Sequence, residues 1–117
     1  MKKIFLVLAL ISSLAQAGEW SSTDKLLAET ALATAIIDWR QTQLIAEEPN
    51  CWEKNPLLGR KPSMKHINLY FAGAIIANYL IADSLSEKWR RAWLSGLIGL
   101  ELITVNNNRQ LGIKLKF

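Results

Sequence analysis

Residues 67–84 read INLYFAGAIIANYLIADS, and this apolar stretch decides the fold. No Asp, Glu, Lys or Arg occurs between Lys65 and Asp83, a length near the lower limit of roughly 17 residues for a membrane-spanning helix. A helix that is apolar on nearly every face is either deeply buried or surrounded by lipid, and a small bundle in water cannot bury one completely. The stretch therefore predicts a membrane-embedded helix over about residues 64–84.

Two further helices are predicted on either side of this stretch. Residues 24–48 are rich in Ala, Leu, Glu and Gln and contain no Gly or Pro, which favours one helix ending before Pro49. Its candidate N-caps are Ser21, Ser22, Thr23 and Asp24. Residues 87–105 form the third predicted helix, with Asn106–Asn108 as its stop. We therefore expect an all-α fold, in which a signal peptide is followed by a three-helix membrane-embedded bundle.

Residues 49–63 form the predicted connection between the first two helices and hold all three prolines of the chain. Asn55 precedes Pro56, and this position disfavours helical backbone. Gly59 permits a positive φ angle. The composition predicts a Pro-rich loop of defined shape, at the membrane interface or re-entrant.

The first 17 residues have the three parts of a cleavable Sec signal peptide. Met1–Lys3 is positively charged, Ile4–Leu14 is apolar but short for a bilayer, and Ala15–Ala17 is a small-x-small cleavage site. The mature chain is then predicted to begin at Gly18, and residues 18–117 form a single helical membrane domain. A permanent N-terminal anchor is the alternative.

Composition argues against several functional classes. The net charge of +4 is modest and no dense basic run with interleaved aromatic residues occurs, so we expect no nucleic-acid partner. Cys51 is the only cysteine and His66 the only histidine, and no metal-ligand spacing is present. Neither a Ser/His/Asp or Cys/His arrangement, a Gly-rich phosphate loop nor HExxH is found. We therefore predict no catalytic residue, no metal and no cofactor.

The distribution of Lys and Arg predicts an orientation. If Gly18 lies outside and three helices span, the segments placed inside carry more Lys and Arg than those placed outside, as the positive-inside rule requires. The basic run Lys88–Arg91 is the exception. The expected location is the bacterial inner membrane, with the mature N-terminus periplasmic and Cys51 cytoplasmic; the periplasm is the alternative.

Polar side chains on the predicted helices and loop form a candidate cluster. A charged group inside lipid is costly unless it is paired or hydrated, so we expect Asp38 and Glu101 to face the bundle interior. The whole cluster comprises Asp38, Gln41, Thr42, Glu53, Asn55, Asn78 and Glu101. It could share a proton or bind a cation or lipid headgroup, or its members could hydrogen-bond one another and set the helix register.

Four segments carry a resemblance to a known group. They read DWRQT from residue 38, EKNPLLG from residue 53, NLYFA from residue 68 and WRRAW from residue 89. Together they resemble a family of small uncharacterised proteobacterial and phage membrane proteins with a D-x-x-Q-T helix and an E-x-N-P-x-L-G loop. The resemblance implies a helical membrane protein and no particular activity. Members often carry a histidine near the position of Asn78, where this chain departs from the pattern.

The leading functional prediction is a small exported inner-membrane protein, non-enzymatic and phage- or prophage-associated, that acts through protein or lipid contacts. Its expected partners are membrane lipid and a second copy of the chain or another membrane protein. Two alternatives stay open. One is a membrane enzyme or a protein that handles protons or ions through buried carboxylates. The other is a soluble periplasmic helical binding module.

Overall fold

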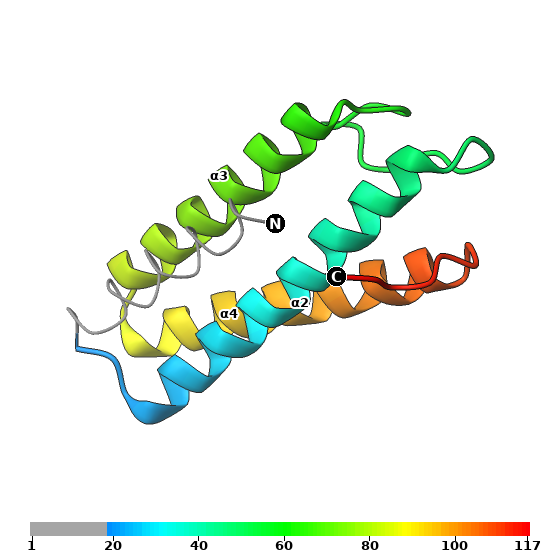
Figure 1. Cartoon of the computed structure of the whole chain (residues 1–117). Coiled ribbons are helices and arrows are strands. Elements are labelled where there is room, and N and C mark those ends of the chain that lie inside the picture. Colours follow the sequence, from blue (N-terminus) through cyan, green and yellow to red (C-terminus); the bar gives the residue numbers. More distant parts are fainter. Residues whose placement is uncertain (1–18) are drawn as a thin grey trace.

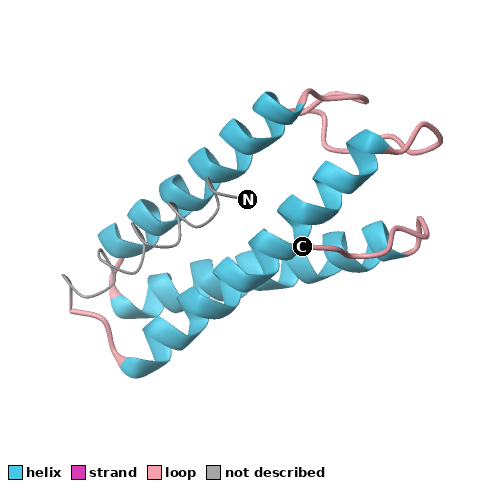
Figure 2. Ribbon diagram, viewed as in Figure 1, coloured by secondary structure: helices cyan, strands magenta, loops and turns pink. Residues whose placement is uncertain are grey.

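The computed structural model describes residues 19–117, which form three α-helices and no strand (Figures 1 and 2). The helices are α2 (Ser22–Glu47), α3 (Met64–Ser84) and α4 (Glu87–Arg109). This confirms the all-α, three-helix part of the sequence-based prediction. The predicted signal peptide, residues 1–17, lies outside the described residues.

The three helices make unequal contacts. α2 packs most extensively against α4 and less against α3, while α3 and α4 touch each other least. Figure 1 shows α3 and α4 meeting at the short turn that joins them, with α3 lying apart from α4 towards its own N-terminal end. The α2–α4 interface is therefore the main interior surface of the bundle.

Polar side chains set the helix starts. Ser21 is the N-cap of α2: its hydroxyl accepts a hydrogen bond from the Asp24 N–H at 3.0 Å, and the Asp24 carboxylate accepts one from the Ser21 N–H at 3.2 Å. This reciprocal capping box satisfies two N–H groups that have no partner within the helix. Ser63 caps α3 by accepting a hydrogen bond from the His66 N–H at 3.1 Å.

The predicted stop of the third helix at Asn106–Asn108 is wrong, because α4 continues through these residues to Arg109. Asparagine has a low helix propensity, but tertiary contacts routinely override such a preference. The Asn108 side chain is buried and hydrogen-bonded to α2. The chain turns away only at Gly112, whose φ of 81° suits glycine.

The apolar core is narrow and lies mainly on one stripe of α3. Its α3 members are Ile67, Phe71, Ile75, Tyr79 and Ala82, which pack with Trp20, Trp39, Leu58 and Leu94. Two aromatic stacks order it: Trp20 with Tyr79 at a centroid distance of 5.2 Å, and Trp39 with Phe71 at 5.8 Å. Such pairs add roughly 0.5–1.5 kcal/mol beyond their area burial.

Besides this apolar core, the fold buries several polar side chains and exposes many large apolar ones. The buried polar side chains lie chiefly on α2 and α4: Asp24, Thr34, Asp38, Gln41, Thr42, Gln43, Arg90 and Asn108. Many large apolar side chains on the outer faces of α3 and α4 are exposed instead, among them Leu69, Leu80, Leu100 and Ile103. Within residues 19–117, no helix combines the length and apolar character needed to cross a bilayer.

Candidate functional site

A pair of carboxyl groups lies at the α2–α4 interface. Asp38 of α2 is only 8% exposed, and its carboxyl lies within hydrogen-bonding distance of the Glu101 carboxyl of α4. Asp38 Oδ1 also accepts hydrogen bonds from Asn108 Nδ2 at 3.0 Å and from the Thr42 hydroxyl at 3.4 Å. Two carboxyl groups can bond directly only if one of them carries a proton. The raised pKa values of both groups favour a state in which one proton lies between them.

The electrostatic environment keeps this proton in place at neutral pH. Burial, the nearby charge of Asp38 and the hydrogen bond to Asp38 together raise the pKa of Glu101 to about 8. The pKa of Asp38 is also raised: burial and the charge of Glu53 outweigh the hydrogen bonds from Glu101, Asn108 and Thr42, which lower it. Near pH 7 Glu101 is therefore largely protonated.

Asn108 connects the pair to a second side chain of α2. Its Nδ2 donates to Gln41 Oε1 at 3.0 Å as well as to Asp38, and Gln41 Nε2 donates to the Val105 carbonyl at 3.2 Å. The structure thus brings the predicted residues Asp38, Gln41, Thr42 and Glu101 together. Asn108 was missed as a cluster member, although its spacing of seven residues from Glu101 places both on one face of a helix.

The two loop residues of the predicted cluster have different roles. Glu53 Oε1 accepts hydrogen bonds from the N–H groups of Lys54 and Asn55 at 3.1 and 3.0 Å, and the charge of Glu53 contributes to the raised pKa of Asp38. Asn55 bonds elsewhere: its Nδ2 donates to the Tyr70 hydroxyl at 2.9 Å and its Oδ1 accepts from the Leu57 N–H at 3.0 Å. Glu53 therefore belongs to the electrostatics of the pair, whereas Asn55 shapes the loop.

A small cavity adjoins the carboxyl pair. Its volume is about 60 Å³, and all three helices contribute to its wall. Apolar side chains make up most of the lining, with Glu101, Asn78 and Tyr79 as the polar contributors. Asn78 thus shares the cavity wall with Glu101 and makes no hydrogen bond to Asp38.

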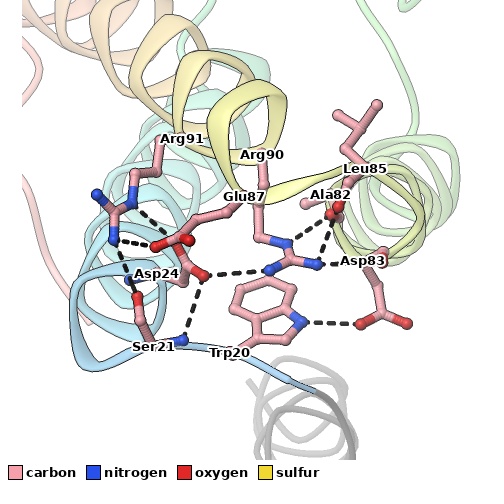
Figure 3. Close-up of polar contacts among 9 residues, drawn as sticks. All are labelled: Trp20, Ser21, Asp24, Ala82, Asp83, Leu85, Glu87, Arg90 and Arg91. Atoms are coloured by element: carbon pink, nitrogen blue, oxygen red, sulfur yellow. Dashed lines mark hydrogen bonds and ion pairs between the residues drawn. The ribbon is translucent and has the colours of Figure 1, made fainter.

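A second polar cluster lies at the other end of the α2–α4 interface (Figure 3). Asp24 forms ion pairs with Arg90 and Arg91 at 3.1 Å each, and its side chain is 1% exposed. Burial alone would raise the pKa of Asp24, but hydrogen bonds from the Ser21 N–H and from both guanidinium groups outweigh burial and hold that pKa below its usual range. This cluster is therefore charge-compensated.

Arg90 also ties the end of α3 to the chain before α2. Its guanidinium donates to the carbonyl oxygens of Ala82, Asp83 and Leu85 at the end of α3, and lies 4.7 Å from the centre of the Trp20 ring. Trp20 Nε1 in turn donates to Asp83 Oδ1 at 2.8 Å. The basic run that was the exception to the predicted orientation thus has partners inside the fold.

The site does not have the donor set of a metal centre. Among residues 19–117, no three His, Cys, Asp or Glu side chains come together in a way that could hold a metal ion. Comparison of the chain with known protein families, curated proteins and solved structures finds no match. The functional argument therefore depends on the geometry of the site and of the outer surface.

Proposed function

We propose that this chain is a small non-enzymatic helical protein that works while seated in a lipid bilayer through the outer faces of α3 and α4. One observation carries the proposal: large apolar side chains on α3 and α4 are exposed, while several polar side chains, among them Asp24, Asp38 and Arg90, are buried. A protein folded in water selects against such an apolar surface, because its exposure costs roughly 25 cal/mol per Å². Lipid removes this cost and makes polar groups face inwards.

The exposed apolar side chains lie on continuous helix faces. On α3, Leu69 and Leu80 are 61% and 53% exposed and are eleven residues, or three turns, apart. On α4, Trp89, Leu100 and Ile103 are 61%, 67% and 61% exposed and share one face. Contiguous apolar surface of this kind marks an interaction site, whereas single exposed apolar residues do not.

The length of this apolar surface limits how deeply the protein can insert into a bilayer. From Trp89 to Ile103 the apolar face of α4 extends roughly 21 Å, at about 1.5 Å per residue, against a hydrocarbon core of about 30 Å. We therefore propose that the helices insert their apolar faces into the bilayer without crossing it. This is a more limited form of the membrane-embedded bundle predicted from the sequence. Trp89 with Lys88 beside its ring, at 5.7 Å, suits a headgroup boundary.

Flotation of the mature chain, residues 18–117, with phosphatidylcholine–phosphatidylglycerol vesicles tests the proposal. We expect the wild-type chain to float with the vesicles and to resist alkaline extraction. The double variant Leu80→Ser/Leu100→Ser should float at least five-fold less. Its matched control, Leu26→Ser/Leu57→Ser, replaces two leucines that are equally exposed but lie outside these two faces, and it should float like the wild type. Equal flotation of both variants, or a wild-type chain left in the aqueous fraction, would contradict the proposal.

A second candidate function, proton handling, is favoured by the Asp38–Glu101 pair. A proton can pass between two carboxyl groups that lie next to each other. The pKa of Glu101, about 8, allows proton release near physiological pH. Infrared spectroscopy should show a protonated-carboxyl band at pH 6 that fades above pH 8 and is missing in Glu101→Gln. A band unchanged in that variant would rule this role out.

A further inference from the structure

The cavity beside the carboxyl pair exists because α2 presents small side chains to it. Ala28, Ala31 and Ala35 follow at helical spacing on the face of α2 that lines the cavity. Leu97 of α4 and Ile75 of α3 close the apolar part of the wall. The result is a space of about 60 Å³ whose wall is apolar except at a few positions.

Two polar atoms of the cavity-lining residues have unmet hydrogen-bonding capacity. Glu101 Oε2 and the Tyr79 hydroxyl are both buried, and neither has a hydrogen-bond partner within the described part of the chain. Tyr79 is only 7% exposed, so bulk water does not compensate. A buried polar atom without a partner costs about 1–3 kcal/mol, and a bound molecule that supplies the partner recovers this cost.

The charge around the cavity is also uncompensated. Asp38, Glu53 and Glu101 form no ion pair within residues 19–117, where every ion pair instead involves Asp24 or Glu87. No positive charge is among the causes that shift the pKa of Glu101. Buried acidic groups are normally either paired with a cation or neutralised by a proton, and here a proton on Glu101 does this, so a cation that binds in the cavity takes the place of that proton.

We propose that this cavity binds a short alkylammonium ion. The ammonium group donates hydrogen bonds to the Glu101 carboxylate, and its binding releases to solvent the proton that Glu101 holds in the free protein near pH 7; its alkyl part packs against Ala31 and Leu97. A cavity of about 150 Å³ holds benzene, with six carbon atoms, so 60 Å³ accommodates two or three non-hydrogen atoms. Ethylammonium has this size and charge, and the proposal holds whether or not the protein meets a bilayer.

The expected affinity follows from the size of the ligand. Even for the most efficient small ligands, the binding free energy per non-hydrogen atom has an upper limit. For a ligand of three such atoms, this limit corresponds to a Kd on the order of 1 mM. Nuclear magnetic resonance titration suits this range. The alanine methyl groups of the cavity wall, in a chain carrying ¹³C-methyl alanine, report directly on occupancy.

The experiment compares ethylammonium chloride with ethanol at pH 7.5, at constant ionic strength. We expect the methyl signals of Ala28, Ala31 and Ala35 to shift and to saturate in the millimolar range with ethylammonium, and ethanol, which is neutral and of equal size, to bind at least ten-fold more weakly. Glu101→Gln should weaken ethylammonium binding at least ten-fold. Glu29→Gln, an exposed change of the same type on α2, should leave it unchanged.

Three results would overturn the proposal. The first is a wild-type chain whose alanine signals do not shift up to 50 mM ethylammonium. The second is equal binding of ethanol, which would show an apolar cavity without preference for charge. The third is unchanged ethylammonium binding in Glu101→Gln. Ala31→Leu, which fills the cavity, should abolish binding; if this variant does not fold, the comparison with Glu101→Gln still decides.

Discussion

Replacement of Glu101 by Gln should make the protein more stable at neutral pH, although it removes a charged residue from the site. The ordinary pKa of this carboxyl is 4.5, and in the fold it is about 8. Between these values the unfolded chain has released the proton and the folded chain still holds it. Stability therefore falls as pH rises from about 4.5 to about 8. The glutamine side chain of the variant never ionises, and its amide N–H donates to the Asp38 carboxylate as a protonated Glu would.

The magnitude follows from the pKa of Glu101. One pKa unit corresponds to 1.36 kcal/mol, and pH 7 lies about 2.5 units above the ordinary pKa, so Glu101 lowers the free energy of unfolding by about 3 kcal/mol at pH 7. Glu101→Gln should recover an amount of this order at pH 7. The difference between variant and wild type should shrink to less than about 1 kcal/mol near pH 5, where both side chains are uncharged in the fold.

Urea denaturation followed by circular dichroism at pH 5, 6, 7 and 8 measures this difference. It is done in the same mild detergent for each chain, so that bilayer contact does not enter the comparison. Glu29→Gln is the matched control, because Glu29 is exposed on α2. The reasoning is refuted if Glu101→Gln is less stable than the wild type at pH 7, or if the decline of stability from pH 5 to pH 8 is as steep in the variant as in the wild type.

Two further substitutions test the remaining polar contacts by the same urea assay. Asp24→Asn leaves the buried Arg90 charge without its partner and should lower the free energy of unfolding by about 3–5 kcal/mol; a loss under 1 kcal/mol would mean that the ion pair is not formed. Asn108→Ala removes a donor from Asp38 and should cost about 1–3 kcal/mol. Asn107→Ala, one residue away and exposed, is its control, and an equal loss in both would contradict a stabilising role of the Asn108–Asp38 hydrogen bond.

The helices could be predicted from the sequence because local signals mark them. A stretch rich in Ala and Leu, with no Gly or Pro, predicts α2, and Pro49 marks its end. The end of α4 could not be predicted this way, since Asn108 is helical for a tertiary reason: its side chain bonds to Asp38 and to Gln41 across the interface. Local propensity contains no information about such a contact.

The candidate site was predictable to a similar extent. The cost of exposing charge to lipid predicts from sequence alone that Asp38 and Glu101 face the interior, but their contact depends on how α2 and α4 are rotated against each other. The ion pairs of Asp24 are a stronger case, because 66 and 67 residues separate it from Arg90 and Arg91. No periodicity within one helix indicates a pairing over such a distance.

The two polar clusters of the α2–α4 interface differ in a way that stability does not explain. Asp24 has two guanidinium partners and a lowered pKa, whereas Asp38, fourteen residues or roughly 21 Å further along α2, faces Glu101 and has a raised pKa. The ion pairs of the compensated cluster already join the two helices. A second cluster whose ionisable groups are all acidic lowers the stability of the fold near neutral pH, and natural proteins accept such a local conflict mainly at functional sites. The uncompensated end, with its adjoining cavity, is therefore where function is to be sought.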